Sequence, residues 1–256
     1  ASATRSTTEP MSLPVHLVPS LEGVTAGATV VVEGDEAHHA VAVRRLRLGE
    51  RLVLTDGLGR SVLGEVAATG KRSLDVRVHE ATRDPEPAPS VTVVQALPKG
   101  DRGELAVEVL TEVGVARVVP WAASRSVAVW KGERAEKGLA KWRSTAREAA
   151  KQARRTWHPV VDPMAGTPRV AELVAAADLA VVLHEDATTT LTGLEVPATG
   201  SLLVVVGPEG GIAAEELAAF TAAGATSVRL GSEVLRTSTA GVAAVAALLS
   251  RTSRWS

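Results

Sequence analysis

The feature that most constrains this fold is a proline-rich segment that separates two different hydrophobic patterns. Residues 83–90 read Arg-Asp-Pro-Glu-Pro-Ala-Pro-Ser, and three prolines in a polar stretch cannot sustain a helix or a central strand. Short apolar runs broken by turns precede this segment, and strands alternating with helices follow it. We predict four parts: a flexible N-terminus over 1–13, a small β domain over 14–82, a linker over 83–90 and an α/β domain over 91–256.

The first domain is predicted to consist of short strands. Runs of Val and Leu occur at 29–33, 51–56, 62–66 and 74–78, separated by turn signals such as Asp-Gly and Thr-Gly-Lys. Strands at this spacing indicate a small barrel or sandwich. One short helix fits residues 35–46, with Asp35 as its N-cap.

The second domain shows the alternation typical of a parallel sheet covered by helices on both faces. The expected strands are 91–97, 116–120, 179–183, 202–206 and 227–230, and the expected helices are 101–113, 133–156, 171–177, 213–223 and 237–249.

The sharpest local motif follows the expected strand 202–206. It reads Gly207-Pro208-Glu209-Gly210-Gly211 and leads directly into a helix. The carboxyl ends of strands are where open α/β sheets bind ligands, and glycines let a backbone approach a ligand closely. The motif matches neither of the common nucleotide-binding glycine patterns and contains no lysine, which disfavours nucleotide hydrolysis. A tight turn without a ligand is the alternative, and spacing alone leaves both interpretations open.

Two further strand ends carry polar residues. Leu230-Gly231 leads to Arg236 at the start of the last helix, and His184 directly follows the strand 179–183. Arg236 could equally be a surface cation ahead of a helix capped by Thr237 and Ser238, and a lone histidine is more often structural than catalytic. Three such strand ends within about 60 residues nevertheless predict one shared crevice.

Basic residues are clustered although the chain as a whole is nearly neutral, with a net charge of −1. Eight lysines and arginines stand against two acidic residues between Arg134 and Trp157, and Glu148, Gln152 and Arg155 are expected on one helical face. Two further clusters are Arg44-Arg45 with Arg47, and Lys99 with Arg102. A solvated helix face is the common alternative for one cluster. Three basic clusters on two domains favour a nucleic-acid partner over a merely solvated surface.

Several classes of function are excluded. The absence of cysteine rules out disulfides, cysteine-ligated zinc and a thiolate nucleophile. No His, Asp and Glu spacing suits a metal, and no serine-hydrolase elbow occurs. No apolar run is long enough for a membrane span, and the first ten residues lack the apolar core of a signal peptide. We therefore expect a cytoplasmic protein with no metal and no membrane partner.

These motifs together resemble one family, the ribosomal small-subunit RNA methyltransferase E family, which makes N3-methyluridine in 16S rRNA. The segments that carry the resemblance are 38–45, 49–50, 96–102, 207–211 and 230–240, and the helix with Trp142, Glu148, Ala149, Gln152 and Arg155. The resemblance implies a PUA-like β-barrel that binds RNA and a C-terminal SPOUT methyltransferase domain. The latter is an α/β fold with a deep trefoil knot that binds S-adenosylmethionine and forms a homodimer.

The resemblance also implies roles for individual residues. Arg236 and Glu209 are the expected catalytic residues. The expected cofactor-binding residues are Leu183, His184, Gly207, Pro208, Glu209, Gly210, Gly211, Leu230, Gly231, Leu235, Arg236 and Thr237. The expected RNA-binding residues are Arg44, Arg45, Arg47, Lys99, Arg102, Arg125, Arg154 and Arg155.

Three positions depart from the family pattern: Ser238 where glutamate is usual, Val109 where lysine is usual and Arg44 where leucine is usual. Serine cannot act as a carboxylate base at neutral pH, so the base must lie elsewhere. The expected function is methylation of uridine N3 in 16S rRNA of the small ribosomal subunit. A SPOUT enzyme for another RNA position and a non-catalytic RNA-binding assembly factor are the alternatives.

Overall fold

The computed structural model describes residues 13–255, which divide into two compact units. Unit 1 runs to Pro85 and also includes Arg154–Thr156, whereas unit 2 comprises Glu86–Ala153 and the chain from Trp157. The units therefore divide within the segment predicted as a linker, although the domain bounds given above stay a prediction. The predicted flexible segment 1–13 lies outside the described residues except for Leu13.

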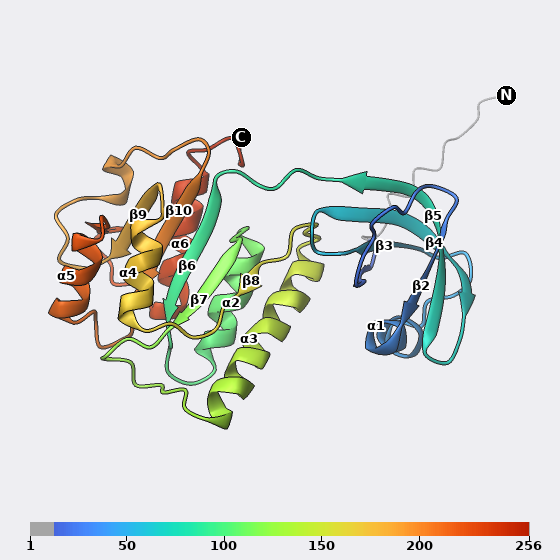
Figure 1. The fold of residues 1–256 in the computed structure, drawn as a ribbon, viewed down its shortest axis with the longest axis horizontal. Helices are drawn as coiled ribbons and strands as arrows, with labels where there is room; N and C mark the ends of the chain where they lie inside the picture. Colours follow the sequence, from blue (N-terminus) through green and yellow to red (C-terminus); the bar gives the residue numbers. More distant parts are fainter. Residues whose placement is uncertain (1–12, 256) are drawn as a thin grey trace. The chain divides into compact units, whose positions relative to one another are not determined.

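Unit 1 is built on a five-stranded sheet in the order β1-β3-β4-β5-β2 (Figure 1). Its strands are β1 (Val15–Leu17), β2 (Thr29–Glu33), β3 (Arg51–Thr55), β4 (Arg60–Thr69) and β5 (Ser73–Arg83). The β1–β3 pair is parallel and the other pairs are antiparallel. The four predicted strands are present, and β1 was missed because three residues are too few to show a periodic pattern.

The predicted helix over 35–46 is shorter and less regular than expected. The structure has an α-helix, α1 (Gly34–His38), followed by one π-helical turn, η1 (His39–Val43). Glu33 occupies the N-cap position, so the prediction of Asp35 as the cap was wrong. Asp35 lies in the first turn, where its Oδ1 accepts a 3.0 Å hydrogen bond from Arg72 Nη2.

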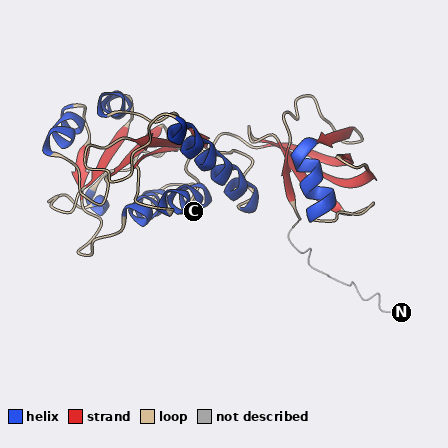
Figure 2. Ribbon diagram, turned by 90° about the horizontal axis from the view of Figure 1, so that it is seen from below, coloured by secondary structure: helices blue, strands red, loops and turns tan. Residues whose placement is uncertain are grey.

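Unit 2 contains a six-stranded sheet in which every pair of neighbouring strands is parallel, as predicted (Figures 1 and 2). The strand order is β11-β9-β10-β6-β7-β8. The strands are β6 (Ser90–Ala96), β7 (Arg117–Trp121), β8 (Val160–Val161), β9 (Leu179–Leu183), β10 (Ser201–Val206) and β11 (Thr226–Val228). Only the two-residue β8 escaped prediction.

Helices cover both faces of this sheet and create two apolar cores. They are α2 (Arg102–Glu112), α3 (Glu133–Gln152), α4 (Thr167–Ala175), α5 (Ala214–Ala222) and α6 (Thr237–Leu249), with a 3-10 turn η2 (Leu191–Gly193). Val204 joins one core with α2, α3 and α6, whereas its neighbour Val205 joins the other with α4 and α5. This alternation follows from the period-two geometry of a strand. Across residues 13–255, no helix has the length and apolar character needed to cross a bilayer.

The basic helix α3 ends four residues before the predicted Thr156. Arg154 has a φ of 54°, in the left-handed region that cannot continue a right-handed helix. Arg155 therefore lies beyond the helix, and its predicted place on one face with Glu148 and Gln152 was wrong.

Candidate functional site

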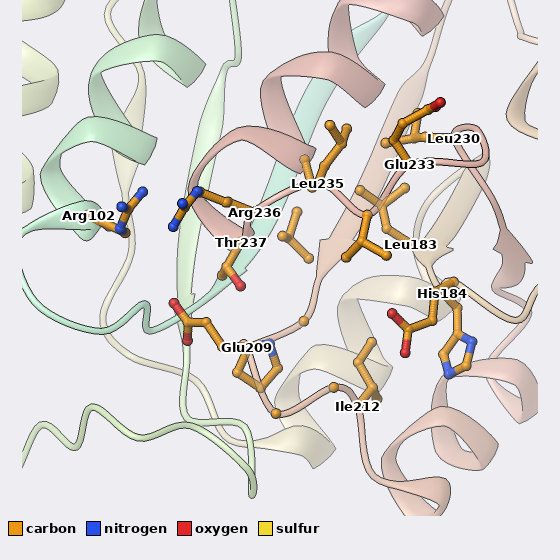
Figure 3. Close-up of a pocket in the computed structure, with 18 of the residues that line it drawn as sticks. Arg102, Leu183, His184, Glu209, Ile212, Leu230, Glu233, Leu235, Arg236 and Thr237 are labelled. Atoms are coloured by element: carbon orange, nitrogen blue, oxygen red, sulfur yellow. The ribbon is translucent and has the colours of Figure 1, made fainter.

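One cavity of about 1270 Å³ lies in unit 2 at the carboxyl edge of the sheet (Figure 3). Its walls include chain at the carboxyl ends of five parallel strands: 99–102 and Leu105 after β6, Arg125 after β7, 183–186 at β9, 206–212 at β10 and 228–237 from β11 onward. The three strand ends that the sequence singled out thus meet at one crevice. Parallel strands make this possible because all their carboxyl ends lie on the same edge.

The structure brings every predicted cofactor-binding residue to this cavity. Its lining includes Leu183, His184, Gly207, Pro208, Glu209, Gly210, Gly211, Leu230, Gly231, Leu235, Arg236 and Thr237. Both expected catalytic residues, Arg236 and Glu209, are therefore also at the cavity.

The predicted RNA-binding residues fall into two groups. Lys99, Arg102 and Arg125 line the cavity. The other five lie in unit 1. Arg44, Arg45 and Arg47 follow η1 and are exposed. Arg154 and Arg155 belong to the segment Arg154–Thr156, in which Arg154 is exposed and Arg155 is half-buried.

Arg236 lies at the cavity although its strand does not neighbour β10, because β9 lies between β10 and β11. Helix α6 compensates because it packs back onto β10. A Cβ atom added to Gly241 of α6 would lie only 3.2 Å from Val206 Cγ2.

The glycine turn after β10 leaves no room for larger residues. A Cβ atom at Gly207 would lie 2.7 Å from Ile212 Cγ1, and Gly211 has a φ of 73° that disfavours other residues. Glu209 between them is exposed, and its Oε1 accepts a 3.2 Å hydrogen bond from the backbone N–H of Lys99. This bond ties the β10 loop to the loop after β6.

The buried carboxylate of Glu216, which no sequence pattern pointed to, fixes the far side of this turn. Its Oε1 accepts hydrogen bonds from Ser124 N at 2.9 Å and Thr167 Oγ1 at 3.1 Å, and its Oε2 accepts one from Ala213 N at 3.2 Å. Three donors satisfy a charge that is costly to bury alone. Glu216 therefore anchors the start of α5 just beyond the cavity.

Gln95 is a second buried polar residue that sequence reasoning missed. It is the penultimate residue of the apolar strand β6 and is 1% exposed. Its Nε2 donates to Thr237 O at 3.2 Å and to Ala96 O at 3.1 Å. Gln95 Oε1 and Ser238 Oγ are buried without a hydrogen-bond partner among residues 13–255. The available signal was a polar side chain inside a run of Val and Ala, which a buried strand tolerates only when the side chain is bonded.

Charges of both signs surround the cavity. The cations are Lys99, Arg102, Arg125, Arg229 and Arg236, and the carboxylates are Asp101, Glu185, Asp186, Glu209 and Glu233. Within the described part of the chain, no group of three or more His, Asp and Glu side chains could hold a metal ion. The cavity thus offers apolar surface, glycine backbone and guanidinium groups to a ligand.

Comparison with known proteins identifies the family. A family model described as an RNA methyltransferase domain matches residues 84–249, and one described as an RNA methyltransferase PUA domain matches residues 32–78. The Ribosomal RNA small subunit methyltransferase E of Mycobacterium bovis is 51% identical over 233 residues, which cover 90% of this chain and 89% of the relative. The chain belongs to the ribosomal RNA small subunit methyltransferase E family.

Other members of the methyltransferase E family agree with this assignment. The Bacillus subtilis member is 29% identical, over 86% of this chain and 89% of its own. The crystal structure of the Neisseria gonorrhoeae member, bound to S-adenosyl methionine, is 27% identical with a TM-score of 0.83, covering 93% of this chain and 98% of that one. The predicted family, the mixed α/β fold and the PUA-like domain are confirmed.

Proposed function

We propose that this chain transfers the methyl group of S-adenosylmethionine to N3 of a uridine in 16S rRNA of the small ribosomal subunit. The observation that carries the proposal is a cavity in which loops from β9, β10 and β11 converge on Arg236, in a chain of the methyltransferase E family. The resemblance to the methyltransferase E family supports N3 as the modified atom, and the chemistry below describes how this chain would methylate it.

The residues at the cavity fit the proposed cofactor. Leu183, Ile212 and Leu235 supply apolar surface for an adenine ring from three different loops, and the glycine turn 207–211 exposes backbone N–H and C=O groups. The volume of about 1270 Å³ exceeds that of an ordinary small-molecule pocket, about 300–1,000 Å³. It therefore has room for a target base beside the cofactor.

When bound, S-adenosylmethionine supplies an electrophilic methyl group on a sulfonium. The task of the protein is to align that group with the acceptor nitrogen and to help the uracil imide lose its N3 proton. Arg236 stabilises the negative charge that develops on the uracil carbonyl oxygens. Glu209, held by the Lys99 backbone N–H, or solvent receives the proton. Ser238 is buried and has no carboxylate, so it is not the base.

The rest of the molecule holds the RNA in this proposal. Arg44, Arg45, Arg47, Lys99, Arg102, Arg125, Arg154 and Arg155 are the proposed contacts to phosphates. The PUA-like β-barrel over 14–82 would bind RNA, the linker would span 83–90, and residues 91–256 would form a knotted SPOUT domain that pairs in a cytoplasmic homodimer. The family membership supports these features.

The test is transfer of labelled methyl from S-adenosylmethionine to unmethylated small subunits and to naked 16S rRNA, followed by nucleoside identification. N3-methyluridine in the product is the expected result, and another methylated nucleoside would contradict the proposed position. If the chain binds RNA but neither transfers a methyl group nor binds S-adenosylmethionine, the proposed methyltransferase activity is contradicted.

A further inference from the structure

We propose that Arg102 and Arg236 together bind one phosphodiester group of the RNA strand at the cavity. The inference rests on the proposed function, because that function makes an RNA strand the substrate. It deepens the phosphate contact already proposed for Arg102, because it names Arg236 as the second arginine on the same phosphodiester group.

The fold brings these two arginines together from distant parts of the chain. Arg102 is the first residue of α2, and Arg236 immediately precedes α6. Both helices follow parallel strands and therefore start at the same edge of the sheet. They pack against each other, since a Cβ atom at Gly241 of α6 would lie 3.3 Å from Leu110 Cδ2 of α2. Figure 3 shows the two guanidinium groups extending toward one another at the cavity.

Both guanidinium groups lack a partner within residues 13–255: neither forms an ion pair or a side-chain hydrogen bond there. Some other arginines of unit 2 do form ion pairs, as Arg117 does with Asp162 at 3.0 Å and Arg169 with Glu172 at 2.6 Å. Two facing guanidinium groups repel each other, and an anion between them removes that repulsion. Arg102 and Arg236 therefore form a site complementary to an oxyanion.

The shape and exposure of the pair favour a phosphodiester. The planar donors of a guanidinium match the two non-bridging oxygens of a phosphate, and RNA offers one such group per nucleotide. Both side chains are exposed, so a polymer can reach them. The cofactor carboxylate is the other available oxyanion, and the experiment below separates the two sources.

The experiment measures binding of the full chain to a short labelled single-stranded RNA over a series of salt concentrations. Arg102→Ala should weaken binding on the order of ten-fold at low salt. It should also reduce the slope of log K against log salt by about 0.7, the value for one phosphate contact on a single strand. Arg102→Lys should keep the salt slope and lose part of the RNA affinity. A lysine retains the positive charge but lacks the paired planar N–H donors of a guanidinium. Arg169→Ala, an exposed arginine on α4, is the matched control and should change neither quantity.

A second arm identifies the phosphate itself. A neutral methylphosphonate is placed at each linkage of the substrate RNA in turn. At one linkage the neutral group should weaken binding to the wild-type chain on the order of ten-fold. It should weaken binding to the Arg102→Ala variant by a smaller factor, because the contact that Arg102 makes is already lost and only that of Arg236 remains.

An unchanged salt slope in Arg102→Ala would overturn the proposal. Weaker binding of S-adenosylmethionine with unchanged RNA binding would also overturn it, and would assign the pair to the cofactor carboxylate. The proposed function is tested separately. If the wild-type chain transfers no methyl group but Arg102→Ala still reduces the salt slope of RNA binding, the phosphate site is supported and the proposed methyltransferase activity is contradicted.

Discussion

Gln95 joins two segments that lie 142 residues apart in the chain, because its side-chain amide donates to the carbonyl oxygen of Thr237. Thr237 directly follows Arg236, so this buried bond positions the first turn of α6 and the arginine ahead of it. Gln95 acts through Thr237 rather than on a substrate, which makes it a positioning residue.

Gln95→Leu should lower kcat for methyl transfer on the order of ten-fold with a smaller effect on KM. The buried Thr237 carbonyl loses its donor, which should also lower the free energy of unfolding by about 1–3 kcal/mol. Steady-state kinetics and urea denaturation measure the two effects. Thr111→Val, which removes a buried hydroxyl bonded to Val107 O inside α2, is the control for stability alone. If Gln95→Leu lowers the free energy of unfolding as much as Thr111→Val does and leaves kcat unchanged, Gln95 has only a structural role.

Arg236→Ala should lower kcat about 10²–10³-fold, the range for loss of one group that stabilises developing negative charge. Calorimetry of S-adenosylmethionine binding separates this effect from loss of the cofactor. Arg236→Lys should recover part of the rate because it restores a positive charge. Full turnover in Arg236→Ala with unchanged cofactor affinity would show the assignment to be wrong.

Asp178 makes stability depend on acid pH. Hydrogen bonds from Ser201, through its hydroxyl at 2.8 Å and its backbone N–H at 2.8 Å, lower the pKa of the Asp178 carboxyl below its ordinary value of 3.8. A group with a lowered pKa in the folded state contributes stability above its unfolded pKa and loses it as pH falls through the folded pKa. The free energy of unfolding should therefore decrease as pH falls from 3.8 toward the folded value. Asp178→Asn should flatten that part of the profile in urea denaturation at several pH values, and an unchanged profile would contradict the mechanism.

At the scale of elements, α6 connects the cavity to the core. The helix contains only small and apolar residues from Ala240 to Leu249, and Gly241 permits its close approach to the sheet. A Cβ atom at Gly241 would meet Val206 at 3.2 Å and Leu110 at 3.3 Å, contacts tighter than most real ones.

Gly241→Val should destabilise the protein by about 1–3 kcal/mol, because extra atoms in a packed contact force neighbouring side chains to shift. Thermal or urea denaturation measures the change. Ala218→Val on the exposed side of α5 is the control and should cost only about 0.7 kcal/mol or less, the difference in helix propensity. Equal effects in the two variants would show that α6 does not pack tightly at this position.

At the scale of the whole molecule, the cavity belongs to unit 2 alone, so ligand binding should protect the units unequally. At 100 times its Kd, S-adenosylmethionine should stabilise the folded unit that binds it by about 2.7 kcal/mol. Hydrogen exchange should slow in the cavity loops 183–186, 206–212 and 228–237 and remain unchanged in strands β2 and β5. Free methionine at the same concentration is the control. Equal protection of both units would contradict a cofactor site confined to unit 2.

Local sequence patterns predicted the elements whose residues carry a periodic signal. Strand β9 and helix α6 have the predicted bounds, and the turn 207–211 was recognised because glycine and proline have strong local preferences. Such patterns arise from neighbouring residues, so they can be detected without knowledge of the fold. Asp35 as a cap and the end of α3 were predicted wrongly because the turn geometry of single residues is weakly encoded.

Which of these elements meet depends on the tertiary structure. The position of β9 between β10 and β11, the bond from Gln95 to Thr237 and the placement of Arg102 and Arg236 at one cavity all join residues far apart in the chain. Their proximity depends on strand order and on the packing of α6 against α2 and the sheet. Local periodicity carries no information on that order, because many strand arrangements would bury the same apolar faces equally well.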